Sequence, residues 1–119
     1  SFDVLVMENF VGDVLSDLGG ATVGGIALCP SGNVGDGAAY FEPIHGSAPD
    51  LAGLGRANPI GMIRAAGLML AHLGRMDAAG DLDAALRAAL ASGAVRVGPD
   101  GSVDGGPDGA ASAIVAALG

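Results

Sequence analysis

The 119-residue chain has the length of a single domain, which would bury roughly two-thirds of the surface that its unfolded chain exposes. Half of its residues are apolar and only 15% are charged, a balance that predicts contact with a further surface outside this chain. Its five Arg, its lack of Lys and its net charge of −8 exclude a sequence-independent grip on nucleic acid phosphates.

The apolar runs and the single cysteine narrow the class of protein further. The longest apolar runs are interrupted well short of the roughly 20 residues that a membrane helix needs. No basic segment precedes an apolar run as it would in a signal peptide, so we expect a soluble, cytoplasmic protein. Cys29 excludes an internal disulfide and the Cys-rich metal sites, and a buried thiol is its expected state.

The first expected elements are a strand and a helix. Residues 4–7 are apolar without alternation, as in a strand buried on both faces of a parallel sheet. They follow Ser1 without a lead-in, as in the middle of a longer protein. Residues 10–17 have apolar side chains at helical spacing, and four glycines between positions 19 and 25 predict a flexible crossing that could be a domain hinge.

Short strands and loops are expected next. Residues 26–29 and 39–42 have the composition of short strands, and residues 30–37 between them are rich in turn-forming residues. A Gly- and Pro-rich loop follows. Asn58 fits the N-cap of the next helix, with Pro59 at the first helical position.

The C-terminal half is predicted to be helical. The helix after Pro59 should run to about Leu73, and its apolar residues surround most of the helix axis, which predicts a central, buried element. Residues 76–92 show a cleaner apolar stripe, with Asp83 and Arg87 paired at i,i+4 on the outer face.

A low-complexity loop and a short helix complete the chain. Residues 98–109 contain three Asp among glycines, which suggests calcium, but their spacing of four and the lack of a following Glu depart from the EF-hand pattern. A solvated loop is the favoured interpretation. Residues 110–118 can form a last helix.

Asp13 and Asp17 lie four residues apart in the first expected helix. This spacing places both carboxylates on one helix face, with Cβ atoms about 5–6 Å apart, where they repel each other unless a cation lies between them. Mg²⁺ or Mn²⁺ would complete its octahedron with substrate oxygens and water. The helix dipole also favours acidic residues near an N-terminus, so the spacing alone leaves a structural role open.

His45 and Asp50 are polar residues of the Gly- and Pro-rich loop that could contact a ligand. His45 could contact a bound ring or make a structural hydrogen bond. Asp50 could accept hydrogen bonds from two ribose hydroxyls and repel a 2′-phosphate, which is how acidic residues select NAD over NADP. The residues by themselves leave both roles open.

The common nucleotide motifs and catalytic triads are absent from the sequence. Residues 53–58 contain the first two glycines of a Rossmann fingerprint but lack the third. The lack of Lys excludes a Walker A loop, and His45 and His72 have no sequence neighbours that suggest a triad. A nucleotide site in this chain would be of another type.

Four motifs in one order give these separate signals a common meaning. They are Asn9–Asp17, Pro30–Asn33, Glu42–Gly53 and Ala57–Pro59. In this order they resemble the C-terminal portion of the isocitrate/isopropylmalate dehydrogenase family of β-decarboxylating dehydrogenases. The resemblance implies an α/β fold that forms the C-terminal part of a two-domain enzyme. Residues 1–24 would end the dimerisation and metal-site domain, and residues 25–119 would form the C-terminal segment of the NAD-binding domain.

The resemblance also assigns residues to a metal ion and a cofactor. It implies Mg²⁺ or Mn²⁺ at Asp13 and Asp17, and adenosine between His45, Asn58 and Asp50. Family members that prefer NADP carry Lys and Tyr in place of Asp50 and the next residue, so NAD is implied here. The implied cofactor contacts are Glu42, His45, Gly46, Ser47, Ala48, Asp50 and Asn58.

The implied activity is the oxidative decarboxylation of a small 2-hydroxy acid such as 3-isopropylmalate, isocitrate, homoisocitrate or tartrate. The implied partners of this chain are the remainder of the same enzyme and a second, identical subunit. The family's catalytic Tyr and Lys are not matched, since Tyr40 falls elsewhere and the chain has no Lys, so no catalytic residue is assigned and the chain alone is expected to lack turnover. Leu54 and Arg56 stand where the family often has Lys and Ile. A non-catalytic NAD-binding regulatory subunit and a truncated fragment without activity are the alternatives.

Overall fold

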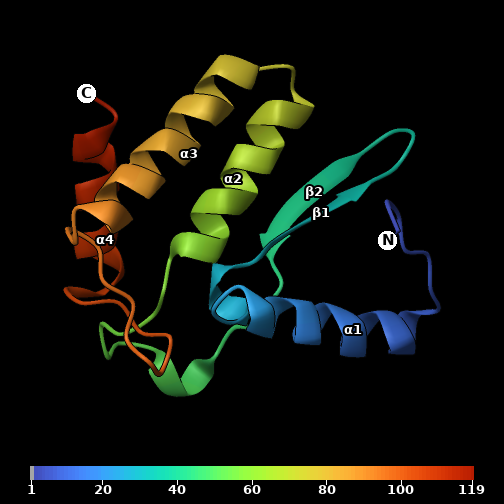
Figure 1. Cartoon of the computed structure of the whole chain (residues 1–119), viewed down its shortest axis with the longest axis horizontal. Helices are drawn as coiled ribbons and strands as arrows, with labels where there is room; N and C mark the ends of the chain where they lie inside the picture. The colour runs from blue at the N-terminus through green and yellow to red at the C-terminus, as the bar shows by residue number, and fades with distance from the viewer. Residues whose placement is uncertain (1) are drawn as a thin grey trace.

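A layer of three helices and a β-hairpin make up most of the fold (Figure 1). The computed structural model describes residues 2–119. Its helices and strands are α1 (Asn9–Thr22), β1 (Pro30–Val34), β2 (Ala39–Pro43), α2 (Ile60–His72), α3 (Met76–Ala91) and α4 (Gly106–Ala117), with the short 3₁₀ turns η1 (Ile26–Leu28) and η2 (Pro49–Leu51). The mixed α/β class is as predicted.

The hydrophobic core lies where α2, α3 and α4 pack together (Figure 1). A tight turn joins α2 to α3, so the two helices run antiparallel, and the segment between α3 and α4 adds the bridge Val97–Val103. The buried side chains of the core are Ile60, Ala85, Leu86, Ala89, Val95, Val103, Ala110 and Ile114. The predicted pair on α3 is confirmed, with Arg87 Nε donating to Asp83 Oδ2 at 2.6 Å.

Helix α2 is central, as predicted, because it packs against the hairpin, η1 and α3, but the prediction that it is a buried element is wrong. Only Ile60, Gly61 and Ala65 of this helix are buried, whereas Met62 is 54% exposed. The helix contacts the hairpin on one side and α3 on another, and no described element covers its remaining apolar surface.

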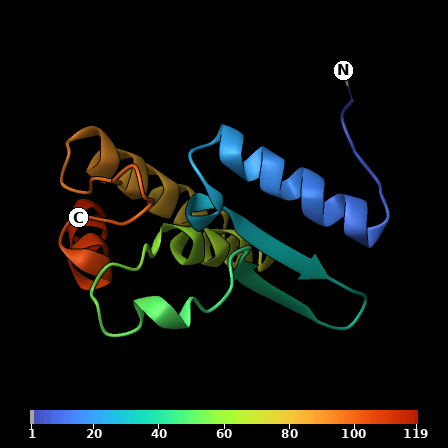
Figure 2. The ribbon, with the colours of Figure 1, turned by 90° about the horizontal axis from the view of Figure 1, so that it is seen from below.

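Helix α1 extends away from the core along one side of the hairpin (Figure 2). Glu8 caps its start, because a side-chain oxygen of Glu8 accepts a hydrogen bond from the Phe10 amide at 3.1 Å. Gly20 is its only buried residue, and Phe10 is 73% exposed. Only near its C-terminal end is this helix therefore buried against other described residues.

The glycines after residue 18 do not break α1 as predicted. A Cβ atom at Gly20 would lie 3.2 Å from Ile26 Cγ2 and 3.6 Å from Cys29 Sγ, so this glycine permits the close approach of α1 to η1. The chain turns only at Gly24 and Gly25, whose φ angles of 106° and 119° are accessible to glycine.

Strands β1 and β2 form an antiparallel hairpin in which Pro30 faces Pro43 and Val34 faces Ala39. The predicted strand at residues 39–42 is confirmed, whereas the loop predicted from residue 30 is largely β1. Phe41 explains the difference, because its ring faces Gly32 across the ladder. A Cβ atom at Gly32 would lie 3.0 Å from two ring carbons, so the aromatic ring covers a glycine that contributes no side chain of its own.

Two predicted strands are absent from residues 2–119. Residues 4–7 are irregular and exposed, because no described strand lies beside them to complete a ladder. Residues 26–28 form η1 instead of a strand. Cys29 follows it as a half-buried rather than fully buried thiol, 3.6 Å from the Gly25 carbonyl oxygen.

No helix in the described part of the chain combines the length and the apolar character that a membrane crossing requires.

Gly61 lets the first turn of α2 rest directly on the base of the hairpin. A Cβ atom at this position would lie 2.9 Å from the Ala27 carbonyl oxygen and 3.2 Å from both the Cys29 carbonyl oxygen and Pro43 Cβ. These neighbours are backbone atoms and a proline ring, which cannot rotate away. The contact therefore requires glycine.

We expect Gly61→Ala to lower the free energy of unfolding by about 1–3 kcal/mol, because the added methyl overpacks this contact. Gly80→Ala is the matched control. Gly80 lies in α3 with open space around it, so its replacement should raise the stability by about 0.5–1 kcal/mol through helix propensity. Urea unfolding of both variants measures the effect, and equal stability changes would contradict the proposed contact.

Candidate functional site

The segment from Glu42 to Asn58 leaves the end of β2, forms an exposed loop around η2 and returns to the start of α2 (Figures 1 and 2). Glu42 lies in β2 opposite Ser31 and is exposed. The next backbone anchor is Ile44, whose amide donates to the Cys29 carbonyl at 3.2 Å. Both ends of the loop are therefore held by regular structure, whereas residues 46–57 are exposed.

His45 is half-buried at the start of this loop. Its Nδ1 atom lies 2.8 Å from the carbonyl oxygen of Gly46, which can only accept a hydrogen bond. The proton of the neutral ring therefore resides on Nδ1, and Nε2 is left as a free acceptor for a ligand donor.

Ala48 has a strained backbone. Its φ of 44° is the only positive value at a non-glycine residue among residues 2–119, and such conformations cost of order 1–3 kcal/mol. The strained residue directly precedes η2, so it sets the direction of the turn that carries Asp50. Strain of this kind concentrates at binding sites, which makes the turn a candidate site on structural grounds alone.

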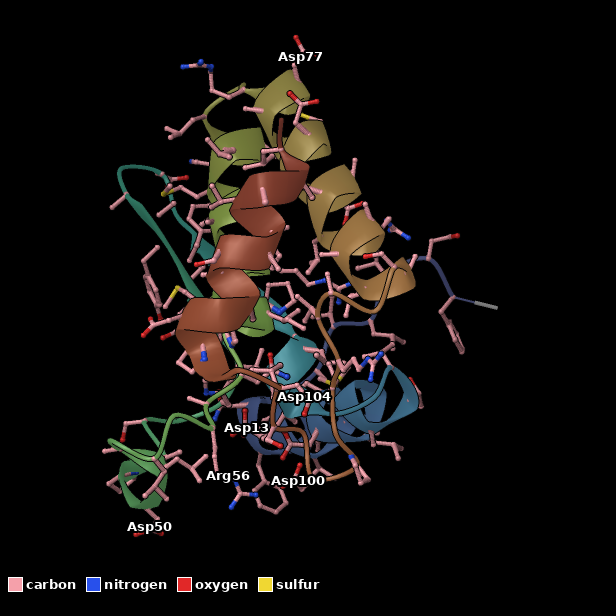
Figure 3. All side chains as sticks on the ribbon, turned by 90° about the vertical axis from the view of Figure 1, so that its left-hand side faces the viewer. Asp13, Asp50, Arg56, Asp77, Asp100 and Asp104 are labelled. Atoms are coloured by element: carbon pink, nitrogen blue, oxygen red, sulfur yellow. The ribbon has the colours of Figure 1, made fainter. Side chains whose placement is uncertain are left out.

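Asp50 lies exposed in η2, and Figure 3 shows its side chain at the outer edge of the loop, pointing away from the helices. Its carboxylate takes no part in the ion pairs or side-chain hydrogen bonds between residues 2–119. Both oxygens can therefore accept hydrogen bonds from a ligand.

Asn58 uses both ends of its amide inside the protein. Its Oδ1 accepts from the Ile60 amide at 3.0 Å, which confirms the predicted capping of α2, although the helix begins one residue later than expected. Its Nδ2 donates to the Gly101 carbonyl at 2.9 Å. The amide therefore connects the end of the loop to the segment before α4. Its second Nδ2 hydrogen remains available for a ligand.

The sequence did not predict a cluster formed by Arg56, Asp100 and Ser102. Arg56 Nη2 contacts Asp100 Oδ2 at 2.5 Å, and Figure 3 shows the two side chains together. Asp100 Oδ1 accepts from both the amide and the hydroxyl of Ser102, at 3.1 and 2.6 Å. Arg56 and Asp100 are 44 residues apart, so no local spacing could have indicated the pair. Because Arg56 and Ser102 occupy the Asp100 carboxylate, the calcium alternative gains no support.

The hydrogen bonds that Ser102 donates, together with Arg56, lower the pKa of Asp100 from 3.8 to about 2. A lowered pKa means that the charged cluster stabilises the fold fully above about pH 4. This contribution is lost as the pH falls through about 2.

We expect an NMR titration of the Asp100 carboxyl carbon to show a midpoint near 2. Ser102→Ala should move the midpoint towards 3.8 by more than Arg56→Gln does, because the hydrogen bonds from Ser102 are the larger cause of the shift. A midpoint near 3.8 in the parent protein would show that the cluster does not form.

Asp13 and Asp17 lie on one face of α1 and are exposed, as their spacing predicted. Asn9 Nδ2 lies 3.5 Å from Asp13 Oδ2. Neither Asp13 nor Asp17 takes part in an ion pair among residues 2–119. No group of three His, Cys, Asp or Glu among residues 2–119 is arranged to hold a metal ion. The pair fits two ligands of a hard divalent cation and leaves the remaining positions to other oxygens.

The Asp13–Asp17 pair and the loop after β2 lie on different sides of the hairpin. In Figure 2, α1 follows one side of the hairpin, and η2 lies on the other side of the hairpin base. The described residues therefore do not bring Asp13 and Asp50 into one pocket. The two groups form separate parts of the candidate site.

Comparison with known proteins identifies a common architecture. The family model described as isocitrate/isopropylmalate dehydrogenase matches residues 1–98. The isocitrate/homoisocitrate dehydrogenase of Thermus thermophilus is 52% identical over 92 residues, which are 77% of this chain and 28% of that protein. The 3-isopropylmalate/3-methylmalate dehydrogenase of Methanocaldococcus jannaschii has the same identity and coverage.

A solved structure extends the match to almost the whole chain. The crystal structure of isocitrate dehydrogenase from Methylococcus capsulatus superposes with a TM-score of 0.88 at 45% identity, covering 98% of this chain and 35% of that one. The chain thus spans between a quarter and about a third of the proteins it matches.

Proposed function

Because the chain belongs to the isocitrate/isopropylmalate dehydrogenase family, we propose that it is the C-terminal part of an NAD-dependent, Mg²⁺- or Mn²⁺-dependent enzyme that oxidatively decarboxylates a small 2-hydroxy acid. The observation that carries the proposal is the loop after β2, where a strained Ala48 presents the unpaired carboxylate of Asp50. Names of the relatives point to isocitrate, homoisocitrate, 3-isopropylmalate or 3-methylmalate as substrate classes, and the resemblance adds tartrate.

The chain's own residues bind and orient the cofactor. When bound, NAD accepts a hydride and the divalent metal ion acts as a Lewis acid on the substrate oxygens. Asp50 would accept hydrogen bonds from the hydroxyls of the adenosine ribose and repel a 2′-phosphate. His45 Nε2 would offer an acceptor and the remaining Nδ2 hydrogen of Asn58 a donor to the adenine. Residues 46–48 would supply backbone beside it, and Glu42 would lie nearer the nicotinamide ribose.

Asp13 and Asp17 supply two carboxylate ligands to the metal ion. Their exposure and their lack of cationic partners leave them free for this role. Further oxygens come from the substrate, water and residues outside this chain. The proton transfers are likewise assigned to residues elsewhere in the enzyme, since the chain has no Lys and Tyr40 lies in β2.

A division into domains accompanies this proposal. Residues 1–24 belong to the metal-site and dimerisation domain, and residues 25–119 to the NAD-binding domain. Two features support the boundary: α1 contacts the rest of the chain mainly through η1, and the left-handed Gly24 and Gly25 form the turn between them.

The exposed apolar side chains of α1 support a homodimer completed by the rest of the enzyme. Phe10, Val14 and Leu18 are each more than half exposed on this helix. Apolar surface of this kind marks an interaction surface. We assign its cover to the remainder of the same subunit and to a second subunit.

For the cofactor, we expect NAD to bind more tightly than NADP, and Asp50→Lys to reduce the ratio of the two affinities by about tenfold or more, since hydrogen bonds to charged groups contribute about 1.5–3 kcal/mol. Calorimetric titration measures both constants. Asp81→Lys is the control, because it makes the same charge change on the exposed side of α3. Equal affinities for NAD and NADP in the parent protein would contradict the role of Asp50.

For the metal, we expect Asp13→Asn to weaken Mn²⁺ binding by at least about tenfold, the lower end of what loss of a supporting residue causes at metal sites. Mn²⁺ titration followed by electron paramagnetic resonance measures the change, with Asp81→Asn as the control. Unchanged Mn²⁺ affinity would count against the metal site. A regulatory NAD-binding subunit would retain the NAD preference, and the full-length protein would then show no Mn²⁺-dependent reduction of NAD by a 2-hydroxy acid.

A further inference from the structure

Residues 45–57 are attached to the rest of the described chain by few polar contacts. The backbone hydrogen bonds of Leu51, Ala52 and Leu54 all end within the loop. The hydrogen bonds that leave residues 45–58 for a distant part of the chain run from Arg56 to Asp100 and from Asn58 to Gly101. Both end in the turn formed by residues 98–104, so this turn determines how firmly the loop is held.

The turn is itself well fixed. The Gly98 amide donates to the Ser102 carbonyl at 2.8 Å, the Asp104 amide donates to the Arg96 carbonyl at 3.1 Å, and Val97 pairs with Val103. Ser102 holds one oxygen of Asp100 through two hydrogen bonds. Asp100 Oδ2, the oxygen that Arg56 contacts, is therefore held in position independently of Arg56.

Backbone packing joins the loop to the chain at a second point. Gly106 follows the turn with a φ of 69°, and a Cβ atom there would overlap the Gly55 carbonyl oxygen. Gly55 is adjacent to Arg56. The Arg56–Asp100 ion pair therefore lies next to a direct backbone contact between Gly55 and Gly106.

We propose that Arg56 and Asp100 form a latch that holds residues 48–58 in the conformation that binds the adenosine of NAD, and that neither residue touches the dinucleotide. The identity of the ligand rests on the proposed function. The apparent dissociation constant of a ligand rises as the fraction of binding-competent protein falls, so a latch of this kind strengthens binding without a contact.

Arg56→Gln, Asp100→Asn and the double variant test the latch. Each single variant should accelerate hydrogen–deuterium exchange in residues 48–58 and weaken NAD binding by about three- to fivefold, the effect of an ion pair with this exposure. The double variant should lose no more than either single variant, because both remove the same interaction. Arg56→Lys should retain most of the affinity, and salt at about 0.5 M should abolish the difference between the parent and Arg56→Gln.

Arg87→Gln is the matched control. The Arg87–Asp83 pair has similar geometry and exposure, with side chains 73% and 47% exposed against 56% and 50% for Arg56 and Asp100, but it lies on α3. It should change neither exchange in residues 48–58 nor NAD affinity.

Two outcomes overturn the latch: unchanged exchange in residues 48–58 in Arg56→Gln and Asp100→Asn, or faster exchange with NAD affinity equal to that of the parent. A parent protein that binds no NAD overturns the proposed function and removes the ligand assigned to the latch. The exchange measurement, which needs no NAD, still decides in that case whether the pair holds the loop.

Discussion

The contact between the start of α2 and the base of the hairpin positions the rest of the candidate site. Gly61 brings the helix against the carbonyls of Ala27 and Cys29, and Arg64 Nη1 donates to the Leu28 carbonyl at 3.1 Å. The same Cys29 carbonyl accepts a hydrogen bond from the Ile44 amide, just before the exposed loop of residues 45–57, and Asn58 caps α2 where that loop ends. Both ends of an exposed loop are thus anchored at one rigid contact, which allows the loop to carry a strained residue without collapsing.

The sequence predicted those elements whose signals are local. The apolar stripe of α3, its Asp83–Arg87 pair and the capping by Asn58 all depend on residues within four positions of one another, and all are confirmed. The family resemblance is also confirmed, since the family model matches residues 1–98. Four short motifs in one order were specific enough to indicate the family without a structure. The roles of Asp13, Asp17 and Asp50 stay predictions that the exposure of these residues permits.

The elements that the sequence missed depend on contacts between distant residues. Gly32 belongs to a strand because Phe41 covers it, and Gly20 belongs to a helix because Ile26 and Cys29 approach it closely. In isolation each glycine indicates a turn. The Arg56–Asp100 pair is the same case within the site, since its residues meet only after α2 and α3 have folded back on each other.

Helix α1 carries both the proposed metal ligands Asp13 and Asp17 and a large exposed apolar surface, and this combination would couple two events. A helix of 14 residues with one buried position gains little stability from its own hydrogen bonds, because isolated helices shorter than about 12–15 residues are marginal in water. Its stability must come from the surface that covers Phe10, Val14 and Leu18. That surface then lies beside Asp13 and Asp17, where the proposed divalent ion would need further oxygen ligands. If Asp13 and Asp17 bind the metal as proposed, covering the apolar side chains and completing the metal site would occur together, so that the proposed assembly and metal binding would strengthen each other.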